Sequence, residues 1–459
     1  MRRAALCFIA VLLGACAGVP RQGGFDTVQQ LAEERVGTHV YWYQGGPEDA
    51  EVQRALETLL GSALTVDGAV TVALLNNRGL QATYEDLGVS QADLVQAGLL
   101  RNPRIGAQVA FPFGTSSPSF IAPSFSLDLD FVSLFTLPMR KRVAEEAFEA
   151  AKLRVTDAVL RLATDVRVSY FKLAAAKQLI ALWKPYLETQ SAAASLAARQ
   201  RAAGNISSLE ESLQLDAYAS GRLQVARAET AALEAYEELT RLLGLWGKAT
   251  DFQVAALPPL PVQEEPLDGL ESVAIRQRLD LAAALHQRNA RAAALGLVRG
   301  TQAVPLLDIG ALAERDSGEG FWSAGPSIAL ELPVFDQGQA RVARAESALR
   351  LEERRLEQLA IEIRSQVRVS RSRLLANRSI VEFYGSTFVP QRARITAESL
   401  LQYNAMQIGL YQLLVAKQGE LNASRELVEA VRDYWTAKAQ LTLAVGGRAG
   451  AAAGDGVRR

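Results

Sequence analysis

Two parts of the chain alternate apolar and polar residues with a period of two, the pattern of a strand whose two faces meet different surroundings. In residues 104–132 the apolar set includes Phe125, Leu127, Leu129 and Phe131, and the polar set includes Ser124, Ser126, Asp128 and Asp130. Residues 304–333 repeat the alternation, with Ile309, Ile328, Leu330 and Leu332 against Asp308, Ser327, Ala329 and Glu331. We therefore expect two strand pairs, with turns at residues 114–119 and 314–320.

After each strand pair the apolar residues change to steps of three and four, which predicts long amphipathic helices. The first helical hairpin is expected over residues 139–245, with Pro185 as the one proline in its first helix. The second is expected over residues 338–445, where Leu410, Leu414, Lys417 and Leu421 follow the coiled-coil period. A helix of roughly 65 residues extends about 100 Å, so it must pack laterally against other long helices.

The two halves of the chain carry similar motifs in the same order, about 200 residues apart. The matched pairs include Leu99 with Leu297, Leu129 with Leu332, Arg142 with Arg341 and Ile206 with Ile408. Such spacing predicts two tandem structural repeats, at residues 61–256 and 269–445. A Pro-rich stretch, residues 257–268, is the expected linker.

Strands of about ten residues have the length that crosses a bilayer in a tilted β-barrel. Four strands cannot close a barrel, since about eight is the smallest number that does, but three chains would supply twelve. Alternation alone is also compatible with a soluble sheet that packs one face on a core, and the long helices favour the membrane interpretation.

The N-terminus has the layout of a bacterial secretory signal. Arg2 and Arg3 precede an apolar stretch, and residues 13–16 read Leu-Gly-Ala-Cys, which resembles a lipobox. We expect residues 1–15 to be a signal peptide, Cys16 to be the lipidated first residue of the mature chain, residues 16–60 to form an N-terminal segment and residues 446–459 a flexible tail. The alternative is an ordinary signal peptide with a chance cysteine.

Composition narrows the function classes. With 49 basic and 50 acidic residues the formal net charge is −1, which lacks the positive field that nucleic-acid binding needs. His39 and His286 are the two histidines, and the sequence shows no nucleophile with a base at motif spacing, no phosphate-binding glycine loop and no cluster of metal ligands. We therefore expect no enzymatic activity, no cofactor and no metal site.

Several stretches resemble the TolC-type family of outer-membrane efflux and secretion channels, over about residues 65–445. They include residues 73–80, residues 98–103 before the first strand, and residues 403–406 with 414–418, which are similar to the lipidated heavy-metal and multidrug branch. The resemblance implies a mainly α protein with membrane β-structure. It implies a homotrimer with a twelve-stranded transmembrane barrel, continued by a periplasmic coiled-coil tunnel.

The resemblance also implies function and partners. The expected function is passive conduction of substrates from a periplasmic adaptor and an inner-membrane pump to the exterior, with the protein lipid-anchored in the outer membrane. Acids on the polar strand faces would then line the pore and favour cations; the candidates are Asp128, Asp130, Asp308 and Glu331. The alternatives are that some of these acids lie in loops, and that the chain is a non-channel coiled-coil lipoprotein, an adaptor or a scaffold.

The hairpin tips are the expected adaptor-binding surface, because small and polar residues interrupt the apolar period there. The tip residues are Gly204, Asn205, Ile206, Ser207, Ser208 and Leu209 in the first hairpin, and Gln407, Ile408, Gly409, Leu410 and Tyr411 in the second. They would also suit plain turns without a partner. Relatives carry an acidic ring just beyond the second tip; here Gln412 and Val415 take those positions, which predicts a gate of Leu410, Gln412 and Leu413, with Glu210 as the nearby acid.

One basic run has no assigned role in this scheme. Residues 364–378 hold five arginines and no acid. The pattern is typical of a solvated helix face, and an electrostatic docking surface for a partner is the alternative.

Overall fold

The structure is a computed structural model that describes residues 18–110, 121–316 and 321–448. The predicted signal peptide, Cys16, the first strand turn and residues 449–459 of the tail lie outside the described residues. The described chain divides into two compact units, which are considered separately. The sheet unit contains residues up to Val28, Glu85–Val155 and Leu279–Ala360; the hairpin unit contains Gln29–Tyr84, Thr156–Arg278 and residues from Ile361 onward.

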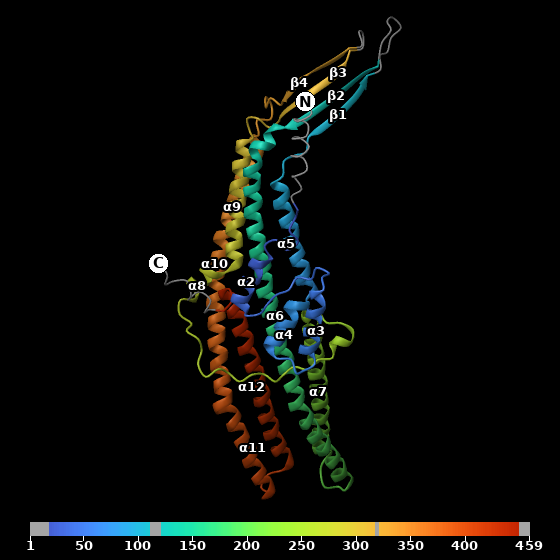
Figure 1. Cartoon of the computed structure of the whole chain (residues 1–459). Helices are drawn as coiled ribbons and strands as arrows, with labels where there is room; N and C mark the ends of the chain where they lie inside the picture. Colours follow the sequence, from blue (N-terminus) through green and yellow to red (C-terminus); the bar gives the residue numbers. More distant parts are fainter. Residues whose placement is uncertain (1–17, 111–120, 317–320, 449–459) are drawn as a thin grey trace. The chain divides into compact units, whose positions relative to one another are not determined.

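Helices make up most of the described chain (Figure 1). The first half contains α2 (Phe25–Val36), α3 (Glu48–Leu60), α4 (Val66–Asn76), α5 (Arg78–Ala97), α6 (Phe131–Ala202), α7 (Ser208–Leu243) and the short η1 (Gly247–Thr250). The second half contains α8 (Leu270–Gln277), α9 (Leu279–Gly300), α10 (Gln339–Phe383), the π-helical turn η2 (Tyr384–Phe388), α11 (Val389–Asn404) and α12 (Leu410–Val445). No helix in these ranges is both long enough and apolar enough to cross a membrane.

The sheet unit holds both predicted strand pairs in one antiparallel sheet of order β1-β2-β3-β4 (Figure 1). The strands are β1 (Arg104–Ala110), β2 (Ala122–Asp130), β3 (Leu307–Arg315) and β4 (Trp322–Leu330). β2 pairs with β3, so the hairpin from the first half of the chain joins the hairpin from the second half. In this register Asp130 lies directly opposite Asp308, and Leu129 lies opposite Ile309.

Three predicted element ends are wrong by several residues. α6 begins at Phe131 rather than after Pro138, because Asp130 caps the helix: its carboxylate accepts from the Ser133 N–H at 2.9 Å. β3 extends through Glu314 to Arg315, which the alternation placed in a turn. β4 ends at Leu330, so Glu331 lies beyond the strand.

The core of the hairpin unit lies along the long helices. The predicted apolar stripe of α6 is buried at Val159, Val166, Tyr170 and Leu173, and that of α10 at Ile363, Val367 and Leu374. Tyr170 also anchors the segment before α4, since its hydroxyl donates to the Leu64 carbonyl at 2.8 Å. This burial shows that the apolar residues spaced by three and four along α6 and α10 form a packing surface.

Similar contacts recur at the ends of α7 and α12. Asn76, the last residue of α4, donates its amide to the carbonyls of Leu243 and Gly244, at the end of α7. Arg278, directly after α8, donates to the Ala444 carbonyl near the end of α12. Each of these two long helices ends in a glycine with positive φ, Gly244 at 68° and Gly446 at 97°, which a residue with a side chain adopts only with strain.

The arginine run of α10 binds the Pro-rich linker and the residues after it. Arg378 pairs with Glu264 at 2.8 Å, Arg371 with Asp268 at 3.5 Å and Arg368 with Glu271 at 3.0 Å. Arg368 and Arg371 remain solvated, with side chains 60% and 45% exposed, whereas Arg378 is 18% exposed. The acidic partners of all three belong to the same chain.

Glu264 is the most buried acid of this contact, with a side chain 11% exposed. Burial raises the pKa of its carboxyl group, but hydrogen bonds from Tyr434 and Arg378 and the charge of Lys438 outweigh burial, so the pKa lies below its ordinary value. Because the folded pKa is depressed, this stabilisation is present above the unfolded pKa and is lost as the pH falls through the folded pKa.

We predict that Glu264→Gln lowers the free energy of unfolding by about 2 kcal/mol at neutral pH, the size of a charge-assisted hydrogen bond lost in a partly buried site. The loss should shrink below pH 4. Urea unfolding followed by circular dichroism measures it, with Glu265→Gln, at an exposed neighbouring acid, as the control. Equal stability of the two variants at pH 7 would contradict the prediction.

Candidate functional site

The sheet has one apolar face and one polar face, because residues directly opposite in the register lie on the same side. The polar face carries Arg104, Gly106, Gln108, Ser124, Ser126, Asp128, Asp130, Asp308, Gly310, Leu312, Glu314, Ser323, Gly325 and Ser327. The apolar face carries Ile105, Ala107, Val109, Pro123, Phe125, Leu127, Leu129, Leu307, Ile309, Ala311, Ala313, Trp322, Ala324, Pro326, Ile328 and Leu330, with Arg315 opposite Trp322 at its end.

In β2 and at the start of β3, exposure on the two faces is inverted relative to a soluble sheet. In β2 the polar residues from Ser124 to Asp130 are half-buried, whereas Phe125, Leu127 and Leu129 are exposed. Ile105 is 80% exposed and Ile328 is 72% exposed. No described part of the unit covers this face as a core would. The alternative of a soluble sheet on its own core therefore does not fit the described residues.

Three of the four predicted pore acids share the polar face, and two of them are neutralised by arginines. Arg104 of β1 reaches across β2 and pairs with Asp308, which is buried. Arg101 pairs with Asp130 at 2.9 Å. Asp128 accepts a hydrogen bond from Ser126 at 3.0 Å. Glu331 directly follows β4, and its backbone N–H donates to the Leu306 carbonyl at 3.2 Å.

Glu314 is an acid on the polar face that the sequence reasoning missed. It lies opposite Ser124 of β2 and Ser323 of β4. Leu312 interrupts the polar alternation of β3, which hid the continuation of the strand through Ala313 to Glu314. The face thus carries four acids against Arg101 and Arg104.

Aromatic residues flank the apolar face. Phe125 stacks on Trp322 with ring centroids 6.1 Å apart, and both are exposed. Phe131, expected at the end of β2, belongs instead to α6 and meets Phe135 edge to face at 4.9 Å. Phe111 and Phe113, which follow β1 in the sequence, lie outside the described residues. The exposed pair suits a boundary between an apolar phase and water.

Both hairpin tips of the hairpin unit close with the same turn. In the first, Gly204 N–H bonds to the Arg201 carbonyl and Asn205 N–H to the Gln200 carbonyl. In the second, Met406 and Gln407 bond in the same way to Tyr403 and Gln402. These are Schellman turns, which need a left-handed residue: Gly204 has φ 77° and Met406 has φ 55°.

The two polar gate candidates have capping roles. Glu210 accepts from the Ser207 backbone N–H at 2.7 Å, and these Ser207 hydrogen bonds hold the pKa of Glu210 below its ordinary value. Gln412 likewise accepts from the Gly409 backbone N–H at 3.0 Å. Both are the third residue of the returning helix, so each completes a helix start.

The two tips face a shared cavity of about 370 Å³. Ile206, Glu210 and Leu213 line it from the first hairpin, and Tyr403, Leu410 and Tyr411 line it from the second. The structure thus brings together predicted tip residues from both halves of the chain. Leu413 of the predicted gate is half-buried and does not line the cavity.

Each histidine has an acidic neighbour among the described residues. His286 Nδ1 lies 2.8 Å from a carboxylate oxygen of Glu146. His39 lies 3.5 Å from Glu33. Within the described ranges no three His, Cys, Asp or Glu residues gather closely enough to hold a metal ion.

Comparison with known proteins agrees with this architecture. The family model described as outer membrane efflux protein matches residues 69–245. CzcC of Cupriavidus metallidurans, a cobalt-zinc-cadmium resistance protein, is 26% identical over 285 residues, which cover 61% of this chain and 65% of CzcC. The match therefore spans just under two thirds of that curated relative.

Solved outer-membrane channels share the fold over most of the chain. The Campylobacter jejuni channel CmeC aligns with a TM-score of 0.72 at 17% identity, covering 83% of this chain and 85% of its own. The open Neisseria gonorrhoeae channel MtrE aligns with a TM-score of 0.68 at 18% identity, covering 83% and 89%. The solved channels thus share the fold of this chain, and residues 69–245 are similar to the outer membrane efflux protein family.

We predict opposite effects of glycine at adjacent positions of the second tip. Met406→Gly should stabilise the tip by about 1 kcal/mol, because it removes the cost of a left-handed side-chain-bearing residue. Ala405→Gly, where φ is −81°, should destabilise it by roughly 0.5–1 kcal/mol. Hydrogen exchange of the tip amides measures both. Faster exchange in Met406→Gly would contradict the assigned turn.

Proposed function

We propose that the protein is the outer-membrane channel of a tripartite efflux system, or of a type I secretion system. It conducts substrates passively from a periplasmic adaptor and an inner-membrane pump to the exterior, and it catalyses no reaction. The observation that carries the proposal is strand β2 of the sheet, whose apolar side chains are exposed while its polar side chains are half-buried. That arrangement suits lipid outside and water inside.

Assembly as a homotrimer completes the surfaces that one chain leaves open. β1 and β4 are the edges of the described sheet, and three copies supply the twelve strands of a closed barrel. The long hairpins then form the periplasmic coiled-coil tunnel. The matching tip turns and the paired glycine ends of α7 and α12 support two tandem repeats per chain.

A non-channel coiled-coil lipoprotein would share the hairpins, but we would expect the apolar face of its sheet to be buried. The tips, with their shared cavity, are the proposed adaptor-binding surface. The likeness to CzcC supports membership of the heavy-metal branch.

We further propose a lipid anchor at Cys16. Mass spectrometry that finds an unmodified Cys16 in the mature protein would refute this anchor.

The function is tested on the full protein purified from membranes. We predict a trimer by mass photometry and discrete ion-conducting steps in a planar lipid bilayer. The matched variant Leu127→Asp places a charge on the proposed lipid face and should lower insertion, because a charge there costs about 2–4 kcal/mol at the bilayer midplane. A monomeric particle without conductance would overturn the proposal.

The Arg104–Asp308 pair gives a prediction for ion selectivity. Arg104→Gln removes one positive charge per chain and leaves Asp308 without its ion-pair partner, so the preference for cations should rise roughly twofold. The reversal potential in a potassium chloride gradient measures this. Arg354→Gln on exposed α10 is the control, and an unchanged reversal potential in Arg104→Gln would place this face outside the pore.

The gate is tested by placing at Gln412 the glutamate that caps the helix of the first tip, at Glu210. Gln412→Glu should keep its helix cap, because Glu210 makes the same hydrogen bond. It adds three carboxylates to a trimer, so micromolar divalent cations should begin to block conductance from the periplasmic side. Gln418→Glu, an exposed position eight residues beyond Leu410, is the control. Block of the wild-type channel at the same concentration would refute an uncharged gate.

A further inference from the structure

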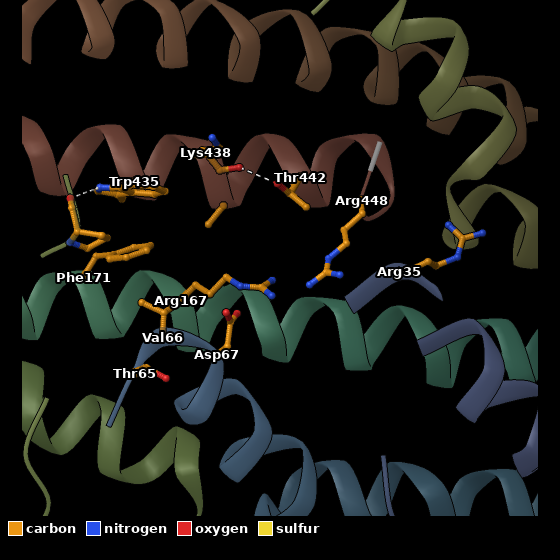
Figure 2. Close-up of a pocket in the computed structure, with 12 residues that line it drawn as sticks. Arg35, Thr65, Val66, Asp67, Arg167, Phe171, Trp435, Lys438, Thr442 and Arg448 are labelled. Carbon is orange, nitrogen blue, oxygen red and sulfur yellow. Dashed lines mark hydrogen bonds between the residues drawn. The ribbon is translucent and has the colours of Figure 1, made fainter. Parts of the chain in front are cut away.

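The hairpin unit contains a cavity of about 450 Å³ at a distance in sequence from both tips (Figure 2). It is lined by residues of α6 and α12, by the start of α4, by Arg35 of α2, and by Pro258 and Arg448. The lining residues used below are Asp67, Arg167, Phe171, Trp435, Lys438 and Arg448. Its volume is in the range of sites that bind small organic molecules.

One wall of the cavity is aromatic and held in place. Phe171 of α6 stacks on Trp435 of α12, with ring centroids 5.6 Å apart. The indole N–H of Trp435 donates to the Pro258 carbonyl at 2.9 Å, as drawn in Figure 2. The indole thus has a fixed orientation, which suits contact with a planar apolar group.

The opposite side carries more positive than negative charge. In Figure 2 the guanidinium groups of Arg167 and Arg448 point toward one another beside the carboxylate of Asp67. Arg35 lines the cavity too, but donates to the Gln277 and Gly446 carbonyls at 2.7 Å each. Lys438 is already paired with Glu264 at 3.4 Å.

Arg167 and Arg448 differ from Arg35 and Lys438 in their partners. Across the part of the chain that the structure describes, neither guanidinium has a carboxylate within ion-pair distance, Asp67 included. Arg167 is half-buried, and burial lowers its pKa, with Asp67 acting in the opposite direction and Arg448 adding to the effect of burial. Arg448 is exposed, so of the two neighbouring cations it is the half-buried Arg167 that loses hydration, which a bound anion would replace.

We infer that this cavity binds a small organic anion that carries a planar apolar group, such as an aromatic carboxylate. The carboxylate would lie between Arg167 and Arg448, whose planar forks match its two oxygens. The ring would lie against Trp435 and Phe171. This inference does not rest on the proposed function, because its observations are contacts within the hairpin unit of one chain.

The test uses the full-length protein in lipid nanodiscs and ¹⁹F NMR titration with 4-(trifluoromethyl)benzoate. The uncharged probe 4-(trifluoromethyl)benzyl alcohol reports partition into lipid. We expect saturable binding of the benzoate and not of the alcohol. Saturable binding of both probes with equal affinity, or of neither up to millimolar concentration, would overturn the inference.

Variants locate the site. Arg167→Gln should weaken benzoate binding by about tenfold or more, the loss of one charge-assisted contact, and Trp435→Leu should weaken it as well. Arg364→Gln, at an exposed arginine outside the cavity lining, is the matched control. If Arg167→Gln does not fold, Arg448→Gln at an exposed position should show the same loss. Unchanged affinity in the folded arginine variant would refute the site.

Discussion

The apolar face of the four-stranded sheet is the surface on which the rest of the account depends. A sheet buries one face against something, since each fully exposed Leu, Ile or Phe side chain forgoes about 1.5–3 kcal/mol of burial. Here β2 has half-buried polar residues, Ser124, Ser126, Asp128 and Asp130, whereas the apolar residues between them, Phe125, Leu127 and Leu129, are exposed. In the proposed assembly, lipid covers this face once further copies pair the sheet edges.

The long helices raise a second problem, because each leaves backbone groups without partners at its ends. The chain solves it with side chains close to the candidate sites. Asp130 caps α6 where β2 ends, while Glu210 and Gln412 complete the starts of α7 and α12 at the tips. Polar residues predicted to line the pore or the gate thus also define where each helix begins. A substitution there changes local structure as well as charge.

Much of the fold could be predicted from the sequence, because alternation and helical periodicity are local signals. The parity of alternation in β2 placed Asp128 and Asp130 on one face, and pairing with β3 added Asp308. Strand ends were harder to predict. Asp130 belongs to the polar alternation and is also the cap of α6, and Leu312 breaks the alternation before Glu314. The partners of Arg368, Arg371 and Arg378 could not be inferred, because acids 97 to 114 residues away in sequence provide them.

Adjacent residues of β2 allow the most direct test of the central claim, that the two sheet faces meet water and lipid. Ser126 lies on the polar face and Leu127 on the apolar face. A cysteine at each position is labelled in the assembled protein, once with a charged, water-soluble methanethiosulfonate during conductance recording and once with a fluorophore exposed to brominated lipid. The account predicts that Ser126→Cys changes conductance on labelling and that lipid quenches only the fluorophore at Leu127→Cys. Quenching at Ser126→Cys, with conductance changed only at Leu127→Cys, would contradict it.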